Sequence, residues 1–287
     1  MLQLSPVVMI GIAAGGVVFV GTLLAVYMLL KHGGSFDRMK HEAMGMPASA
    51  NEEKALLYDE LLDRAKALPP VPAPFKAALE GNRIAIRNIN EKNDLAQLFR
   101  ISNGSACGGL YGESKYDADY LIWKHLEVGP FNSEQQFRAH YTTNTASNGR
   151  HFVLIDREDN KPVGMFTLSH APRHLCCQVE QLWLAPAFQG SGALTETIFV
   201  LLEHLFSLKY RRVEWRCDGH NVRARRAAHS LGFSFEGVLR KHMIIKNCNR
   251  DTVIFSVINS DWVAVQEHLH NRLRQQERKI ADDKKAK

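Results

Sequence analysis

The first 30 residues of the chain contain no aspartate, glutamate, lysine or arginine, although the sequence of 287 residues carries 36 basic and 30 acidic side chains. The run from Val7 to Leu30 is almost entirely apolar. As a helix rising about 1.5 Å per residue, it would be about 36 Å long, enough to cross a bilayer with some tilt. A cleaved signal peptide is the alternative, but such a peptide begins with basic residues and has a shorter apolar stretch. We therefore expect a membrane-spanning helix followed by a separate globular part.

Basic residues flank only the carboxyl side of this segment, at Lys31, Arg38 and Lys40. Because cytoplasmic loops carry an excess of lysine and arginine, we predict a single-pass membrane protein whose globular part faces the cytosol. Gly11 and Gly15 have the spacing that allows two membrane helices to pack closely, which would form a dimer through this segment. Small residues are also common in membrane helices that do not pair, and the sequence leaves both interpretations open.

The rest of the chain divides by composition. An apolar pattern of helical spacing over residues 57–68 predicts an amphipathic helix, and the proline-rich stretch 69–74 predicts a stiff extended link. The predicted organisation is a membrane helix over residues 7–30, a connector over 31–75, a folded domain over 76–262, and a charged tail over 263–287 that begins as a helix and becomes irregular over 281–287.

Strand and helix patterns alternate within the folded domain. Short runs of period-two alternation predict strands, and apolar residues spaced three and four apart predict helices. This order is typical of an α/β fold with a mixed sheet. The predicted strands are 83–89, 151–156, 161–170, 178–184, 211–217, 233–246 and 251–259, with a turn over 247–250, and the predicted helices are 91–101, 133–141, 192–208 and 221–231.

Charge and cysteine content exclude some classes of site. The net charge of +6 suits an anionic ligand or a membrane surface, while acidic residues spread through the tail argue against nucleic acid as a partner. The five cysteines show no repeated CxxC spacing, and the 13 histidines form no HExxH motif. We therefore expect neither a disulfide framework nor a metal site.

The most informative stretch runs from Gln181 to Glu196, where an apolar strand, a proline and a glycine-containing turn lead into a long amphipathic helix. Gly190 and Gly192 would let a ligand approach the backbone, and the first N–H groups of the helix would face it. The pattern favours a pyrophosphate site, which a bulky side chain at Gly192 would fill. An ordinary turn before a helix is the alternative that the local pattern leaves open.

This stretch resembles the acetyl-coenzyme A loop of the GNAT superfamily of N-acetyltransferases, in the run Gln189-Gly190-Ser191-Gly192-Ala193-Leu194. A second segment, WRCDGHNVRARRAAHSLGFSFEGVLR over residues 215–240, resembles motifs of the branch that includes the ribosomal-protein N-terminal acetyltransferases. The resemblance extends over residues 80–262 and is most specific after residue 150. It implies a GNAT-like acyl-CoA N-acyltransferase fold.

The resemblance also implies how acetyl-coenzyme A would bind, without a metal. One strand would splay from its parallel neighbour and pair its backbone with the pantetheine arm, and the glycine-containing loop would hold the pyrophosphate. An asparagine at the start of the next helix would hydrogen-bond the cofactor, and the nearby Arg223, Arg225 and Arg226 would neutralise phosphate charge. A solvent-exposed helix face is the alternative for these arginines. The implied cofactor-binding residues are Leu182, Trp183, Leu184, Gln189, Gly190, Ser191, Gly192, Ala193, Leu194, Asn221 and Arg225.

Acetyl transfer to an amine needs a base for the amine proton and a proton donor for the leaving thiolate. Glu180, on the expected cofactor strand, is the first candidate base. Glu214 and Asp218, on the neighbouring strand and at its end, come next, and a water chain is the alternative. A strand N–H near Leu184 is the expected oxyanion donor. Two residues depart from the family pattern. Leu194 replaces a small residue, and Ala224 replaces a serine proposed to protonate the thiolate in the ribosomal-protein enzymes.

Together these features predict a membrane-anchored N-acetyltransferase that moves an acetyl group from acetyl-coenzyme A to an amine. The acceptor would be a protein or peptide amine, such as a protein N-terminus, or a small amine. The segment 100–150, which would form the acceptor pocket, carries no recognisable motif. The alternative, favoured by Ala224 and Leu194, is a catalytically weak scaffold that binds coenzyme A and recruits partners at a membrane.

Overall fold

The computed structural model describes residues 78–143, 149–171 and 174–285. The chain divides into two units, residues 1–68 and 69–287. The predicted membrane segment, amphipathic helix and proline-rich link all lie in residues 1–77, outside the described residues. Among the residues that are described, no helix is both long and apolar enough to cross a membrane.

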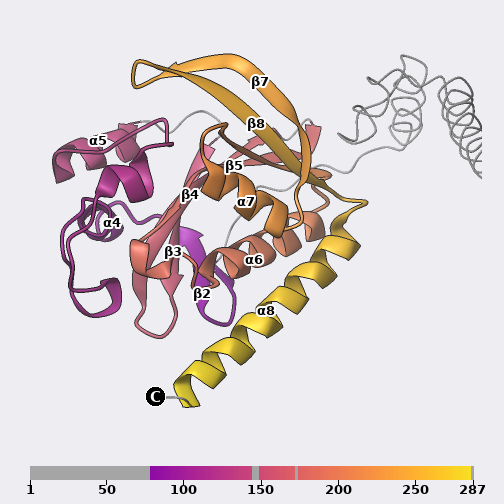
Figure 1. The fold of residues 1–287 in the computed structure, drawn as a ribbon, viewed down its shortest axis with the longest axis horizontal. Coiled ribbons are helices and arrows are strands. Elements are labelled where there is room, and N and C mark those ends of the chain that lie inside the picture. The colour runs from indigo at the N-terminus through magenta and orange to yellow at the C-terminus, as the bar shows by residue number, and fades with distance from the viewer. Residues whose placement is uncertain (1–77, 144–148, 172–173, 286–287) are drawn as a thin grey trace, which may run out of the picture. The chain divides into compact units, whose positions relative to one another are not determined.

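One eight-stranded sheet organises the described part of the chain (Figure 1). Its strand order is β1-β2-β3-β4-β5-β6-β8-β7, and β5 and β6 form its parallel pair while the other neighbours are antiparallel. The predicted mixed α/β sheet is therefore confirmed. The strands are β1 (Leu79–Glu80), β2 (Ile84–Asn88), β3 (Gly149–Asp156), β4 (Lys161–Ala171), β5 (Cys176–Leu184), β6 (Arg212–Asp218), β7 (Ser234–Ile245) and β8 (Cys248–Ile258).

Helices lie on both sides of this sheet, and Figure 1 shows α4 and α5 on one side and α6 and α8 on the other. The four internal helices agree with the predicted ones to within a few residues. The helices are α4 (Asp94–Arg100), α5 (Glu134–Thr143), α6 (Ala193–Ser207), α7 (Val222–Ser230) and α8 (Trp262–Lys285), with short helical turns η1 (Gly109–Tyr111), η2 (Asp119–Trp123) and η4 (Pro186–Phe188).

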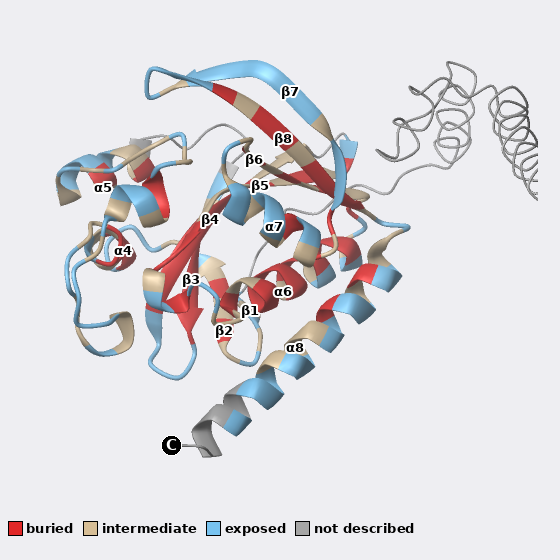
Figure 2. Cartoon of the chain, in the orientation of Figure 1, coloured by how far each residue is buried: buried red, intermediate tan, exposed pale blue. Residues whose placement is uncertain are grey.

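The buried core joins the sheet to α6 and also to α4, η2 and α5. Phe152 and Phe166, on adjacent strands, are fully buried and stack with their ring centroids 5.2 Å apart. On α6 the apolar side chains from Ile198 to Leu205 pack against the sheet, so that this helix is the most extensively buried one in Figure 2. Burying such side chains removes apolar surface from water, which is the main term that stabilises the domain.

Two predicted boundaries are wrong. The turn between β7 and β8 consists of Lys246 and Asn247, both with positive φ, which is the backbone of a tight two-residue hairpin turn, whereas a longer turn over 247–250 was expected. Helix α8 continues to Lys285, where an irregular end over 281–287 was expected. Its sequence contains no glycine or proline and is rich in glutamine, arginine, lysine and alanine, which propagate a helix well.

Gly164, on β4, lies opposite Leu184 at the end of β5. Because it has no side chain, the two strands can approach closely there. A Cβ atom at Gly164 would clash with the backbone carbonyl oxygen of Trp183. We expect Gly164→Ala to displace the end of β5 and lower the free energy of unfolding by about 1–3 kcal/mol, as overpacking does. Urea unfolding of the full-length protein measures this loss. Gly237→Ala, on β7 where the space around a Cβ is open, is the matched control, and an equal loss in both variants would contradict the proposed fit.

Candidate active site

The parallel strands β5 and β6 separate before β5 ends. They pair from Cys176 opposite Arg212 to Val179 opposite Trp215, and β5 then continues to Leu184. A bulge lies at the point of separation, because Gln181 has φ 50° and the register between β4 and β5 shifts there. A bulge bends its strand, so the second half of β5 turns away from β6 and opens a backbone edge. The predicted splaying of this strand is confirmed, and Leu182, Trp183 and Leu184 lie in the opened half.

The loop from β5 to α6 is held by side-chain hydrogen bonds. The Gln189 amide nitrogen donates to the carbonyl oxygens of Leu184 at 3.1 Å and Leu121 at 3.2 Å. Ser191 Oγ accepts from the N–H of Ala193 at 3.3 Å, which leaves other N–H groups of the first turn of α6 for a ligand. Gly190 has φ 80°, and no atom lies within 4 Å of where its Cβ would be, so the backbone can be approached closely there.

A side chain at Gly192 would point in a different direction from one at Gly190. Gly192 is the N-cap of α6 with φ 93°, and a Cβ on it would lie 2.7 Å from Oε1 of Gln276 on α8. The prediction that a bulky side chain at Gly192 would fill the pyrophosphate site is therefore wrong, because that side chain would first meet α8. Gly190 is the loop glycine whose side-chain direction is open.

Two cavities meet beside the opened half of β5. The loop cavity lies next to the β5–α6 loop and is lined by Leu182, Trp183, Leu184, Gln189, Gly190, Leu194 and Arg223. The hairpin cavity lies next to the β7–β8 hairpin and is lined by Gln178, Glu180, Glu127, Arg216, His242 and Arg250. Residues common to both are His125, Leu126, Leu182, Trp215, Asn221 and Ala224. A long ligand lying along β5 would thus pass from one cavity into the other beside Ala224.

Asn221 and Ala224 form the first turn of α7. The Oδ1 atom of Asn221 accepts a hydrogen bond from the N–H of Ala224 at 3.0 Å, which makes Asn221 the N-cap of the helix. The cap uses the side-chain oxygen and leaves the side-chain NH₂ group to donate toward the cavities that Asn221 lines. Asn221 therefore has one structural and one free polar atom.

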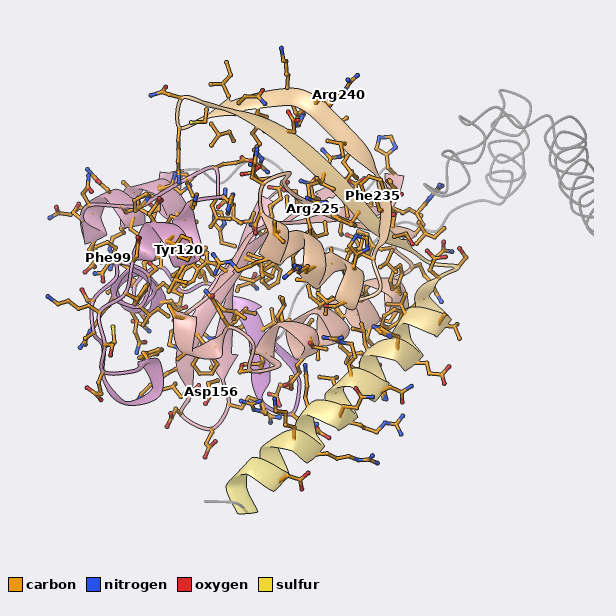
Figure 3. The ribbon with its side chains drawn as sticks, viewed as in Figure 1. Phe99, Tyr120, Asp156, Arg225, Phe235 and Arg240 are labelled. Carbon is orange, nitrogen blue, oxygen red and sulfur yellow. The ribbon has the colours of Figure 1, made fainter. Side chains whose placement is uncertain are left out.

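Arg223, rather than Arg225, lies at the loop cavity. Arg223 donates to the carbonyl oxygen of Tyr120 at 2.7 Å, and its guanidinium carbon lies 5.5 Å from the centre of the Tyr120 ring. Arg225 donates to the carbonyl oxygen of Gly219 at 3.1 Å, and its side chain is exposed on α7 (Figure 3). The prediction of Arg225 at the phosphate site is corrected accordingly, because residues Arg223, Ala224 and Ala227 share the face of α7 that lines the cavity.

Glu180 lies on β5 at the wall of the hairpin cavity. Burial raises the pKa of its carboxyl group, a hydrogen bond with Ser169 offsets part of this, and the nearby charge of Glu127 raises the pKa further. A carboxylate with a raised pKa beside a cavity is suited to accept a proton near neutral pH. The position of Glu180 therefore suits the predicted role of base.

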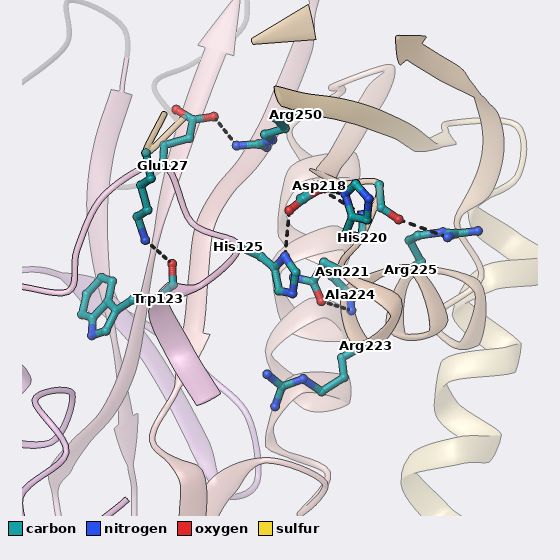
Figure 4. A network of polar contacts seen from close by, with 12 residues as sticks. Trp123, His125, Glu127, Asp218, His220, Asn221, Arg223, Ala224, Arg225 and Arg250 are labelled. Atoms are coloured by element: carbon teal, nitrogen blue, oxygen red, sulfur yellow. Dashed lines mark hydrogen bonds and ion pairs between the residues drawn. The ribbon is translucent and has the colours of Figure 1, made fainter. Parts of the chain in front are cut away.

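The Asp218 side chain is hydrogen-bonded to His125, a residue outside the motifs found in the sequence. Its carboxylate lies 2.7 Å from Nδ1 of His125 and accepts the N–H of His220 at 2.9 Å (Figure 4). Burial would raise the pKa of Asp218, but the hydrogen bonds from His125 and from the backbone of His220 together lower it. An aspartate with a lowered pKa that is already bonded is a poor base, so the prediction of Asp218 as an alternative base is wrong.

The β7–β8 hairpin is tied to the segment 119–127. Lys246 Nζ donates to the carbonyl oxygen of Trp123 at 2.7 Å, and Arg250 Nη1 donates to Glu127 at 3.0 Å (Figure 4). Arg250 is buried, and within the described part of the chain its Nε atom has no hydrogen-bond partner. Arg250 is also one of the residues that line the hairpin cavity, so its guanidinium group brings positive charge to that wall.

His125, Glu127 and Arg250 were not predicted as site residues. The first two follow the buried residues Ile122 and Trp123, whose apolar character indicates only a core position. Arg250 falls in the predicted turn over 247–250, where an exposed side chain is expected, whereas the structure places it in β8. These residues form a site only because the hairpin packs against a segment far away in the sequence.

Neither cysteine chemistry nor a metal site is apparent in the described residues. Cys217 lines the hairpin cavity, but burial raises the pKa of its thiol to about 11, so the thiol is protonated and a poor nucleophile at neutral pH. All five cysteines are free. Over the ranges described, no three histidine, cysteine, aspartate or glutamate side chains are arranged to hold a metal ion.

The two roles of Asn221 can be separated by substitution. Asn221→Asp keeps an oxygen for the N-cap but removes the NH₂ donor and adds charge, so it should weaken binding of acetyl-coenzyme A about tenfold with little effect on stability. Asn221→Ala removes both and should also lower the free energy of unfolding by about 0.5–2 kcal/mol. Calorimetric titration and urea unfolding of the full-length protein measure the two effects. Unchanged affinity in both variants would show that Asn221 only caps α7.

Several solved acetyltransferases have the same fold as this chain. Residues 117–233 match the model of the Acetyltransferase (GNAT) family. A GCN5-related N-acetyltransferase from Brucella melitensis is 28% identical with a TM-score of 0.62, over 71% of this chain and 88% of that one. A probable acetyltransferase of the GNAT family from Chromobacterium violaceum is also 28% identical with a TM-score of 0.61, over 68% of this chain and 93% of that one.

A third structure is an acetyltransferase from Salmonella typhimurium, described as modifying the N-terminal serine of a 50S ribosomal subunit protein. It is 16% identical with a TM-score of 0.52, over 63% of this chain and 99% of that one. This similarity shows a shared fold and nothing more. No curated protein matches the chain significantly. The splayed strand pair, the glycine-containing loop and the capped α7 lie within or beside the matched range. The chain therefore carries a GNAT acetyltransferase domain and is an acyltransferase whose co-substrate is acetyl-coenzyme A.

Proposed function

We propose that the protein is a membrane-anchored N-acetyltransferase whose acceptor is the amino group of a peptide or protein. The observation that carries the proposal is the meeting of the two cavities along the opened edge of β5, with Glu180 on the wall of one of them. The acetyl donor would enter along the loop cavity and the amine through the hairpin cavity. The reacting groups would then meet beside Ala224, which lines both.

The residues of this chain have distinct tasks in that arrangement. The backbone of the opened half of β5 offers N–H and C=O groups to the amide-containing arm of the donor. The loop after β5 and Arg223 offer hydrogen-bond donors and positive charge to phosphate groups. An N–H at the end of β5, near Leu184, would stabilise negative charge on the acetyl oxygen. Glu180 would take the proton of the amine, since burial raises its pKa.

The polar groups of the hairpin cavity favour an acceptor that carries a carbonyl group near its amine. Glu127 and Glu180 supply negative charge to an amine, and the guanidinium group of Arg250 supplies positive charge to a carbonyl oxygen. A peptide amino terminus presents an amine and a carbonyl oxygen close together, which matches both features. A polyamine has no oxygen for Arg250. The Salmonella neighbour, described as modifying an N-terminal serine, is compatible with this acceptor class.

A scaffold without turnover is the competing function. Ala224 favours it, since an alanine cannot donate a proton, but a buried carboxyl group with a raised pKa beside a cavity favours catalysis. Turnover with any amine would exclude the scaffold.

Replacement of Glu180 tests the proposed chemistry. Glu180→Gln should lower kcat about 100- to 10,000-fold, as loss of a general base does. In the wild-type protein, the rate should fall as pH decreases through the raised pKa of Glu180, at a higher pH than for an ordinary carboxyl group, and this dependence should vanish in the variant. The assay follows release of the coenzyme A thiol with peptides bearing a free amino terminus and with polyamines. Glu158→Gln, at an exposed turn, is the control, and equal rates in both variants would refute the assignment.

The membrane anchor rests on the uncharged run from Val7 to Leu30. If this run spans a bilayer with the domain on the cytosolic side, the full-length protein should remain with membranes after an alkaline wash. The double variant Val18→Asp with Phe19→Asp should be released, because each acidic residue at the centre of a span costs about 3 kcal/mol. Val18→Ala with Phe19→Ala is the control. Release of the wild-type protein would contradict the anchor.

A further inference from the structure

The leaving thiolate in this chain needs a proton donor other than the residue at position 224. Ala224 lines both cavities at the first turn of α7, and its methyl side chain carries no transferable proton. Asn221, beside it, uses its oxygen as a helix cap, and an amide is not an acid at neutral pH. Cys217 has a thiol whose pKa is raised to about 11 by burial, so it too donates poorly. The junction of the cavities therefore requires another acid.

His125 is the titratable side chain that lines both cavities. It follows η2, and its imidazole faces the first turn of α7, where Asn221 and Ala224 lie (Figure 4). Its Nδ1 atom is 2.7 Å from the Asp218 carboxylate, and the side chains of the pair are only 17% and 15% exposed. Glu180, by contrast, lines the hairpin cavity. Glu180 therefore lies in the cavity proposed for the acceptor, and His125 lies where the two cavities meet, as a base for the amine and an acid for the thiolate would.

We infer that His125, oriented by Asp218, protonates the thiolate of coenzyme A as it leaves, in place of the hydroxyl group that Ala224 lacks. Asp218 accepts a hydrogen bond from Nδ1–H, which fixes the ring and leaves Nε2, on its other edge, as the nitrogen that can pass a proton to a group in the cavities. His125 is then a catalytic residue, and Asp218 is a positioning residue. The inference rests on the proposed acetyl transfer.

The proton balance of the step is complete with the groups present. The amine nitrogen forms a bond to the acetyl carbon, and the carbon–sulfur bond breaks with its electron pair remaining on sulfur. The sulfur takes the proton from Nε2 of His125, and Glu180 takes the proton of the amine. Glu180 then loses its proton to water, and His125 regains one from water, so the protein returns to its starting state.

A purely structural pair is the competing explanation, since the His125–Asp218 contact also joins η2 to the end of β6. The neighbouring His220 provides a matched control. Its Nδ1 lies 3.4 Å from the same aspartate, but its side chain is 78% exposed. If removing any histidine next to Asp218 lowered kcat, variants of His125 and of His220 would both be slower. If His125 acts at the reacting sulfur, only the His125 variant will be slower.

Kinetics of the full-length protein with acetyl-coenzyme A and a peptide amine test the role. His125→Gln should lower kcat about 100-fold while the affinity for coenzyme A, measured by calorimetry, changes less than about twofold. His220→Gln should leave kcat unchanged. Asp218→Asn should lower kcat about tenfold with an unchanged KM for acetyl-coenzyme A. Adding Ala224→Ser to His125→Gln should recover at least about tenfold in kcat, because a hydroxyl group then lies at the junction.

A spectroscopic measurement on the wild-type protein keeps the test independent of turnover and of the folding of variants. The nitrogen chemical shift of the His125 imidazole Nε2 should change when coenzyme A binds and change much less with desulfo-coenzyme A, which lacks the sulfur. Equal shifts with both ligands, or a kcat of His125→Gln within about threefold of wild type, would overturn the role of His125. Absence of wild-type turnover with every amine, together with a sulfur-dependent shift, would instead overturn the proposed function and leave the contact of His125 with the thiol supported.

Discussion

Beyond Val179, β5 pairs with β4 on one side. On its other side, no strand among the described residues pairs with it, which leaves an open backbone edge. Backbone groups at such an edge are stable only when water or a ligand bonds them, and a ligand with amide groups can replace a strand there. The bulge at Gln181 creates this edge, and the fit of Gly164 against Trp183 positions its end. Both cavities, and the chemistry that depends on them, follow from this one separation of two parallel strands.

The loop cavity and the hairpin cavity, which both lie along this edge, are held by different sets of hydrogen bonds. On the loop side, the Gln189 side chain donates hydrogen bonds to the end of β5 and to the segment near η2, which holds the loop after β5 to both. On the hairpin side, closure depends on contacts between distant segments, Lys246 with Trp123 and Arg250 with Glu127. The first set joins the loop after β5 to the segment near η2, and the second joins the β7–β8 hairpin to the end of η2 and to the residues that follow it. The segment from Leu121 to Glu127 therefore takes part in the contacts on both sides.

The predictable part of the site is the part formed by neighbours in sequence. The run from Gln181 to Glu196 contains a strand, a turn and a helix start, so its geometry follows from local rules, and the capping role of Asn221 follows from its place before α7. The direction of Gly192 could not be predicted, since it depends on where α8 packs. The pairing of His125 with Asp218 likewise depends on the tertiary fold, and it is what changes Asp218 from a candidate base into a positioning group.

Hydrogen exchange of the backbone amides, with and without coenzyme A, tests the central claim that the ligand binds the opened edge of β5. The account predicts that binding slows exchange from Leu182 to Leu184 and in the loop from Gln189 to Leu194, while β2 and β3 on the other side of β4 keep their rates. Unchanged exchange along the second half of β5 at saturating coenzyme A would contradict it, because the ligand would then bind elsewhere on the protein.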